Sequence, residues 1–266
     1  MTGQGDFATH RRDGDYVIKV LDVQHPAGAR LAAAAVSAGK TGMDTYLSTL
    51  RAAGVTLPPD LAVVSAEPLA VRHRWVAGPV LPDCAGADRL RFVGAVAEIA
   101  QWVHALAATD ARLDTNLANF CLAGGQVVLV DVLPPLIPSA APEPSNLFEA
   151  LFTALCFDTP VIRNALIGYA ARALLRSPAG TAHQRDDLAR QVPPALAGPS
   201  GTSFPASWFR ARAVLALRAL AGEVSPGVAH EFFTLTSVRV FRELPEARRA
   251  RRIGHVERAM KELALK

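Results

Sequence analysis

The chain has 266 residues, of which 50% are hydrophobic and 20% are charged. This composition excludes a disordered chain, a collagen-like repeat and a small disulfide-dependent scaffold, because it supplies enough apolar side chains for a sizeable core. The net charge of +4 is too small to indicate a nucleic-acid-binding protein by itself.

The cysteines and the hydropathy of the chain bear on its compartment. Cys84, Cys121 and Cys156 occur singly, without the C-x-x-C spacing of a zinc site and without the pattern of a disulfide framework. The first residues lack the apolar segment of a signal peptide, and every apolar run is interrupted well before the roughly 18 residues that a membrane span needs. We therefore predict a soluble, cytoplasmic protein that does not enter a membrane.

The first elements predicted in chain order are a β-hairpin and a helical stretch. Residues 7–12 and 16–21 predict two strands joined by an Asp-Gly-Asp turn, and Lys19 lies inside the second strand. Residues 27–53 are rich in Ala and Leu with helical spacing and are interrupted by glycines. They predict one or two helices after the hairpin.

Two more extended segments, at residues 61–65 and 69–76, are expected to complete a small sheet. The sequence Ala77-Gly78-Pro79 follows, and Gly and Pro interrupt both helical and strand periodicity. We therefore predict a domain boundary here, with an N-terminal lobe at residues 1–78 and a C-terminal lobe at residues 79–266.

The C-terminal lobe is predicted to be mainly helical. Residues 88–106 show an apolar stripe with the period of a core helix. Residues 177–206 predict a long loop with a short helix around residues 185–192. Further helices are expected at residues 147–156, 161–175, 207–220 and 245–266. The predicted fold class is α+β, with a small β-rich lobe and a larger, mainly helical lobe.

A second predicted hairpin carries the residues with the clearest chemistry. Residues 120–122 and 127–130 predict two short strands around a Gly-Gly turn. Asn119 and Asp131 lie at similar distances before and after this turn, so antiparallel pairing brings their side chains together, and Asp114 can reach the same point. Because Mg²⁺ prefers oxygen ligands, the amide and the carboxylate predict a site for metal-bound ATP. Asp114 is then available to orient or deprotonate a hydroxyl group.

Lys19 is a candidate phosphate ligand. Lysine occurs only at positions 19, 40, 261 and 266. A lysine inside an apolar strand costs desolvation free energy unless an anion pairs with it. We expect the ATP phosphates to be that anion.

The order of these features resembles a known superfamily. Asp114 and Asn119, followed by a hydrophobic hairpin that ends at Asp131, resemble the catalytic loop and metal-binding aspartate of the protein-kinase-like superfamily, and most closely its aminoglycoside phosphotransferase branch. The Tyr-Val-Ile-Lys sequence at residues 16–19 is similar to the strand whose lysine holds the nucleotide phosphates. Residues 72–81 are similar to the linker between the two lobes.

The resemblance implies a bilobal protein-kinase-like fold, ATP and Mg²⁺ as cofactors, and transfer of the γ-phosphoryl group to a hydroxyl of an aminoglycoside, a sugar or a related metabolite. It also implies that an acidic residue on the following helix pairs with Lys19, and Asp44 is the candidate for this partner. It assigns catalysis to Asp114, nucleotide binding to Lys19, Asp44 and Gly5, and metal binding to Asn119 and Asp131.

Two departures from the superfamily pattern support an alternative. Arg112 stands where the superfamily usually has a histidine, two residues before Asp114. Only six residues precede the first hairpin, so the first strand and most of the glycine-rich phosphate cover are expected to be absent, with Gly3 and Gly5 as remnants. The alternative is a pseudokinase-type binding or partner subunit of a peptide- or metabolite-modifying complex.

A third interpretation, an all-helical transcription regulator, depends on the basic terminal helix and requires salt-dependent DNA binding. The alternation of Arg and Glu in that helix favours a solvated surface with ion pairs one turn apart. The predicted partners are thus a nucleotide and a small-molecule acceptor, without nucleic acid or membrane, and with a protein partner under the pseudokinase alternative.

Overall fold

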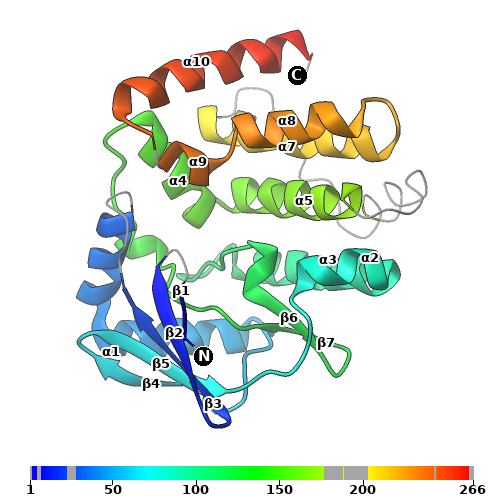
Figure 1. Cartoon of the computed structure of the whole chain (residues 1–266). Helices are drawn as coiled ribbons and strands as arrows, with labels where there is room; N and C mark the ends of the chain where they lie inside the picture. Colours follow the sequence, from blue (N-terminus) through cyan, green and yellow to red (C-terminus); the bar gives the residue numbers. More distant parts are fainter. Residues whose placement is uncertain are drawn as a thin grey trace. The chain divides into compact units, whose positions relative to one another are not determined.

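The computed structural model describes residues 2–4, 7–22, 28–176, 188, 203–242 and 244–263. It is an α+β structure with an antiparallel sheet near the N-terminus and mainly helices afterwards, which confirms the predicted fold class at this level (Figure 1). The chain forms two compact units. The first combines Met1–Leu81 with Gln101–Glu143, and the second combines Pro82–Ala100 with Pro144–Lys266.

A five-stranded antiparallel sheet with the order β1-β2-β3-β5-β4 belongs to the first unit. Its strands are β1 (Thr2–Gln4), β2 (Ala8–Asp13), β3 (Tyr16–Leu21), β4 (Ala62–Ala66) and β5 (Leu69–Arg74). The predicted hairpin and the two later strands are confirmed. The expectation that the first strand is absent is wrong, because three residues of β1 are enough to pair with β2.

The two faces of β3 and β5 differ in polarity. Val71 pairs with Lys19, and His73 pairs with Val17, so these four side chains share one face of the sheet. On that face Val17, Val71 and His73 are buried, whereas Arg72 on the other face of β5 is exposed. Lys19 therefore belongs to the buried face, as its position inside an apolar strand predicts.

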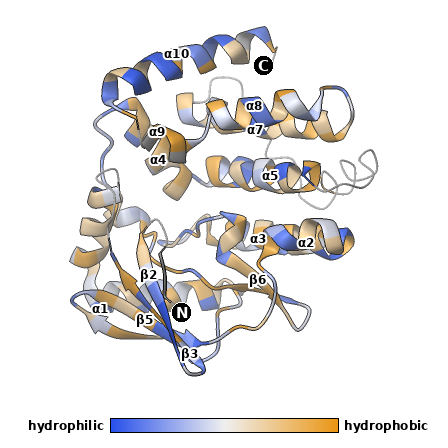
Figure 2. Ribbon diagram, viewed as in Figure 1, coloured by the Kyte–Doolittle hydropathy of each residue, from blue (hydrophilic) through white to orange (hydrophobic). Residues whose placement is uncertain are grey.

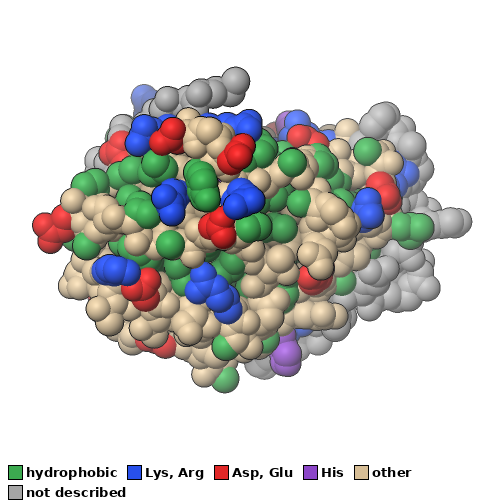
Figure 3. All heavy atoms as spheres, turned by 90° about the horizontal axis from the view of Figure 1, so that it is seen from below, with side chains coloured by type: hydrophobic (Ala, Val, Ile, Leu, Met, Phe, Trp, Pro, Cys, Tyr) green, Lys and Arg blue, Asp and Glu red, His purple; other side chains and the backbone are tan. Residues whose placement is uncertain are grey.

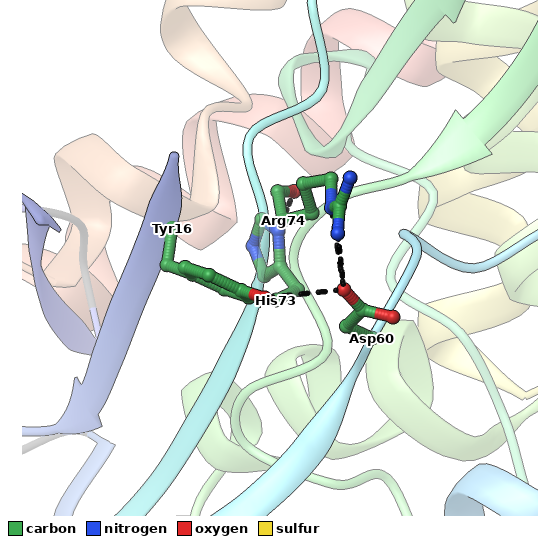
Figure 4. A network of polar contacts seen from close by, with 4 residues as sticks. All are labelled: Tyr16, Asp60, His73 and Arg74. Atoms are coloured by element: carbon green, nitrogen blue, oxygen red, sulfur yellow. Dashed lines mark hydrogen bonds and ion pairs between the residues drawn. The ribbon is translucent and has the colours of Figure 1, made fainter. Parts of the chain in front are cut away.

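The opposite face of the sheet carries an exposed polar cluster. The Tyr16 hydroxyl donates to Asp60 Oδ2 at 3.3 Å, and Arg74 Nη2 forms an ion pair with the same oxygen at 3.1 Å (Figure 4). Asp60 lies in the loop before β4 and has a φ of 58°. The cluster ties this loop to β3 and β5 on the solvent side.

Helix α1 (Ala29–Ala52) follows the first hairpin and packs against β4 and β5. It is kinked at Gly39, where φ is 59°, which explains why the sequence suggested one helix or two. Met43, Tyr46 and Leu50 lie on its buried face. The spacing of these side chains matches one face of a helix that covers a core.

The second predicted hairpin is confirmed as β6 (Phe120–Ala123) and β7 (Gln126–Leu129), and it is preceded by the short 3-10 helix η2 (Leu117–Asn119). An apolar cluster formed by Val76, Cys121 and Val128 joins the hairpin to the linker after β5.

Residues 101–143 belong by their contacts to the first unit, although the predicted division at residue 78 assigns them to the second lobe. Hydrogen bonds explain the difference. Leu129 N donates to Thr56 O at 2.9 Å, and Leu122 N donates to Pro79 O at 3.0 Å. These bonds attach both strands of the hairpin to the N-terminal segment.

The described part of the second unit consists mainly of helices, and α3 belongs to this unit only as far as Ala100. The helices that lie wholly or partly in it have the following bounds. They are α2 (Leu81–Ala87), α3 (Arg89–Leu106), α4 (Leu147–Phe157), α5 (Thr159–Leu175), α7 (Phe204–Leu220), α8 (Pro226–Leu235), α9 (Val238–Arg242) and α10 (Glu246–Glu262). The sequence predicted α3, α4, α5, α7 and α10 but not the short helices α2, α8 and α9. A short 3-10 helix, η3 (Pro138–Ala140), belongs to the first unit.

Arginine side chains hold several of these helices together. Arg212 is buried, donates to Thr236 O at 2.6 Å and lies 4.4 Å from the centre of the Phe233 ring. On α10, which Figure 2 shows as mainly hydrophilic, Arg249 donates to Leu244 O at 2.8 Å and Arg252 donates to Leu235 O at 3.1 Å. Part of the basic character of α10 is therefore structural.

The predicted loop and short helix at residues 177–206 lie mostly outside the described residues. Among the described helices, none is by itself long and apolar enough to cross a membrane, although α4 and α5, bent by 86° at their junction, pass that test as a pair. Figure 3 shows one face on which basic and acidic side chains are interspersed, without a continuous basic patch among the described residues visible there.

Candidate functional site

The hairpin β6–β7 brings Asn119 and Asp131 together at its open end. The backbone carbonyl of Asn119 accepts hydrogen bonds from Val130 N at 2.8 Å and from Asp131 N at 3.4 Å. The antiparallel register pairs Phe120 with Leu129, so the residues before and after these strands are neighbours. The predicted convergence of the amide and carboxyl residues is thus present in the backbone.

Lys19 reaches the same end of the hairpin from β3. Its Nζ donates to Val130 O at 2.7 Å and forms an ion pair with Asp131 Oδ1 at 3.3 Å. The side chain of Lys19 is 12% exposed and that of Asp131 is 30% exposed. Lys19 is therefore not a solvent-facing lysine, and Asp131 supplies the anion that its partly buried charge requires.

The carboxylate of Asp131 retains capacity for a further ligand. Its Oδ1 is buried and accepts no hydrogen bond from the described residues, so the ion pair is the contact that compensates it. Such an atom fits a cation that binds oxygen. The described residues contain no group of three or more His, Cys, Asp or Glu side chains at metal distance.

The loop before β6 holds Asp114 beside Asn119. Asp114 Oδ1 accepts a hydrogen bond from Asn116 N at 2.9 Å, and Asn119 Nδ2 lies 3.5 Å from the Asp114 carbonyl oxygen. The first contact is an Asx-turn, which Asp and Asn form readily. The Asp114 side chain is exposed. Asp114, Asn119 and Asp131 are thus linked by successive short contacts, and Lys19 joins them through Asp131.

Arg112 anchors this loop to the end of α3. Its Nη1 donates to Leu106 O at 2.7 Å and to Thr109 O at 2.8 Å, and its Nη2 donates to Ala107 O at 3.1 Å. The carbonyl groups at a helix C-terminus lack intrahelical partners, and a guanidinium can satisfy several of them at once. Arg112 therefore fixes the chain two residues before Asp114.

Tyr46 was not predicted as part of the site. It extends from α1, is buried, and donates its hydroxyl to the Arg112 carbonyl at 2.8 Å. Burial raises the pKa of Tyr46 far above its usual value, and the nearby carboxylates of Asp114 and Asp131 act in the same direction. Its place in the apolar stripe of α1 is the sequence signal that could have identified it as buried.

The expectation that Asp44 pairs with Lys19 is wrong. Asp44 Oδ2 lies 2.7 Å from Nζ of Lys40, one helical turn earlier, and both side chains are about half exposed. The reason is the helical period: Tyr46, two residues later, faces the core, so Asp44 lies on the solvent side of α1. Gly5, the other predicted nucleotide contact, lies outside the described residues.

His73 is a second residue that the sequence analysis did not include in the site. It is 3% exposed, and its Nδ1 lies 2.8 Å from the Arg74 carbonyl oxygen. Burial lowers the pKa of His73, and Lys19 and Asp131 are close enough to act on it electrostatically. The alternation of Val71 and His73 with the exposed Arg72 and Arg74 is the pattern that could have placed it on the buried face.

Comparison with models of known protein families and with curated proteins found no significant match to the chain.

Proposed function

We propose that the chain binds ATP with Mg²⁺ at the site formed by Lys19, Asn119 and Asp131, and transfers the γ-phosphoryl group to a hydroxyl of a small molecule such as an aminoglycoside, a sugar or a related metabolite. The protein-kinase-like fold of the aminoglycoside phosphotransferase branch is part of this proposal. The observation that carries it is the ion pair between Lys19 and Asp131, with Asn119 and Asp114 adjacent. These are the residue types, in the chain order, that the resemblance requires.

Lys19 suits a phosphate-binding role because its ammonium group is fixed in position but keeps N–H donors for a further partner. An ammonium group has three N–H donors, and one of them is used for Val130 O. Its ion pair with Asp131 prevents a large desolvation cost in the absence of nucleotide. Phosphate oxygens can then take the remaining donors when ATP binds.

Asn119 and Asp131 are the residues that would hold the metal. When bound, Mg²⁺ neutralises part of the negative charge on the ATP phosphates. The side chain of Asn119 uses its nitrogen toward the Asp114 carbonyl, which leaves its oxygen as a ligand atom. Asp131 supplies the buried Oδ1 described above.

Asp114 would orient the acceptor hydroxyl. In the proposed step the hydroxyl oxygen forms a bond to the γ-phosphorus, while the bond from that phosphorus to the β–γ bridging oxygen breaks and ADP leaves with the electron pair. The hydroxyl proton passes to the carboxylate of Asp114. Most of the rate acceleration then comes from positioning and charge neutralisation. Because Arg112 and the Asx-turn fix the loop, the position of Asp114 does not depend on a histidine.

The proposal is tested by thermal unfolding of the intact protein with millimolar MgATP. A ligand that binds the native state raises the unfolding temperature. We expect an increase for the wild type, its loss with excess EDTA, and its loss in Asp131→Ala. A parallel assay of ADP formation with candidate hydroxyl compounds tests the transfer step. Turnover supports the phosphotransferase, whereas absence of stabilisation at millimolar MgATP contradicts the proposed function and favours the pseudokinase-type subunit.

A further inference from the structure

A buried hydrogen-bond acceptor lies next to the candidate nucleotide site. His73 Nε2 is buried and has no hydrogen-bond partner among the described residues. It lies on the same sheet face as Lys19, diagonal to it in the register of β3 and β5. Diagonal neighbours on one face are within reach of aromatic and long side chains, so His73 borders the phosphate-binding lysine.

The hydrogen bond of the other ring nitrogen determines which tautomer is present. A carbonyl oxygen can only accept, so the 2.8 Å contact between Nδ1 and the Arg74 oxygen requires a proton on Nδ1. Burial lowers the pKa of His73, which favours the neutral ring at pH 7. In the neutral ring with Nδ1 protonated, Nε2 carries a lone pair and acts as an acceptor.

We propose that His73 is a further nucleotide-binding residue, whose Nε2 accepts a hydrogen bond from the amino group of the ATP base. This inference rests on the proposed function. Nε2 repels phosphate oxygens, which are themselves acceptors, so it requires a donor. The donors of ATP are its base amino group and its ribose hydroxyls. Of these, the amino group belongs to a flat, largely apolar ring, which suits a face that also carries the buried side chains of Val17 and Val71.

The experiment compares two nucleotides on the intact protein by isothermal titration calorimetry with Mg²⁺. ATP has the amino group, and purine riboside triphosphate has a hydrogen in its place. A buried acceptor left without a donor weakens binding, so we expect the wild type to prefer ATP by roughly tenfold. His73→Asn keeps a donor for the Arg74 carbonyl but removes Nε2, and it should bind both nucleotides equally. His73→Gln places an acceptor at the reach of Nε2 and should retain a preference.

His104 provides the matched control, because it is an exposed histidine in the last turn of α3. His104→Asn should bind both nucleotides as the wild type does. Equal binding of the two nucleotides by the wild type, or an unchanged preference in His73→Asn, overturns the inference and leaves the proposed function standing. Failure of the wild type to bind either triphosphate overturns the proposed function and the inference with it.

A second measurement is independent of nucleotide binding. Long-range ¹H–¹⁵N NMR of the free protein at pH 7 should show His73 protonated at Nδ1 and unprotonated at Nε2. A proton on Nε2 contradicts the inference even if ATP binds, because Nε2 would then be a donor and not an acceptor.

Discussion

Nζ of Lys19 lies 3.3 Å from Oδ1 of Asp131, so a cation from β3 and the anion that follows β7 compensate each other within the first unit. In the proposed nucleotide complex these two groups have different partners, because the ammonium binds phosphate oxygens and the carboxylate binds the metal. The ion pair therefore stabilises the free protein and is the interaction that MgATP has to rearrange.

The first prediction concerns the energetic coupling of this pair. Lys19→Met leaves a partly buried carboxylate without its cation, and Asp131→Asn leaves a mostly buried ammonium without its anion. Each single substitution should lower the free energy of unfolding by about 1–2 kcal/mol. The double variant should lose about as much as one single variant, and not the sum of the two, because it leaves no isolated charge. Urea unfolding measures all four proteins, and strictly additive losses would show that the two charges do not interact.

Gly78 provides a second prediction, on the linker after β5. A Cβ at this position would overlap the carbonyl oxygen of Leu122 in β6, so Gly78→Ala requires a backbone shift and should destabilise the protein by about 1–3 kcal/mol. Gly94 in α3 has open space around the equivalent position. Gly94→Ala should be neutral or stabilise the protein by up to about 1 kcal/mol. Equal unfolding temperatures for the two alanine variants would contradict the close approach of linker and hairpin.

Arg112 provides the third prediction. Arg112→Gln removes the guanidinium that binds the carbonyl groups at the end of α3, and it should cost about 2 kcal/mol of stability. Hydrogen exchange should increase in the loop that carries Asp114. Arg251→Gln, on the exposed face of α10, is the control and should change stability by less than about 0.5 kcal/mol. Unchanged exchange in the loop of Arg112→Gln would mean that the arginine does not anchor it.

His73 provides a prediction for the dependence of stability on pH. Burial lowers the pKa of His73 in the folded state, so the unfolded chain binds a proton more readily. Stability therefore decreases as the pH falls below about 6.5, the ordinary pKa of histidine, and the decrease continues down to the lowered pKa. His73→Phe should reduce this slope in unfolding temperatures measured from pH 5 to 8. A slope identical to that of the wild type would show that another group causes it.

The sequence predicted most of the regular elements because their signals are local. The turn residues around Gly14 and the Gly-Gly pair after Ala123 define both hairpins, and the apolar stripe of α3 defines a long helix. The short helices α8 and α9 were missed because their few turns give weak periodicity, although Ser225 caps α8 by accepting a hydrogen bond from Val228 N.

The candidate site was predictable where it depends on hairpin geometry and not where it depends on tertiary packing. Asn119 and Asp131 are brought together by the register of a short hairpin, which the sequence contains. The partner of Lys19 could not be predicted in this way, because it depends on which face of α1 packs inward. Asp44 lies on the outer face of that helix. The hydrogen bond between Tyr46 and the Arg112 carbonyl could not be predicted either, because it depends on the position of α1 beside the loop.

Direct binding of MgATP to the intact protein, measured by isothermal titration calorimetry, tests the central claim most directly. The account predicts saturable binding by the wild type, loss of binding in Asp131→Ala, and retained binding in Asp114→Ala, because Asp114 acts on the acceptor and not on the nucleotide. Absence of binding by the wild type at millimolar MgATP, or unchanged affinity in Asp131→Ala, would contradict it.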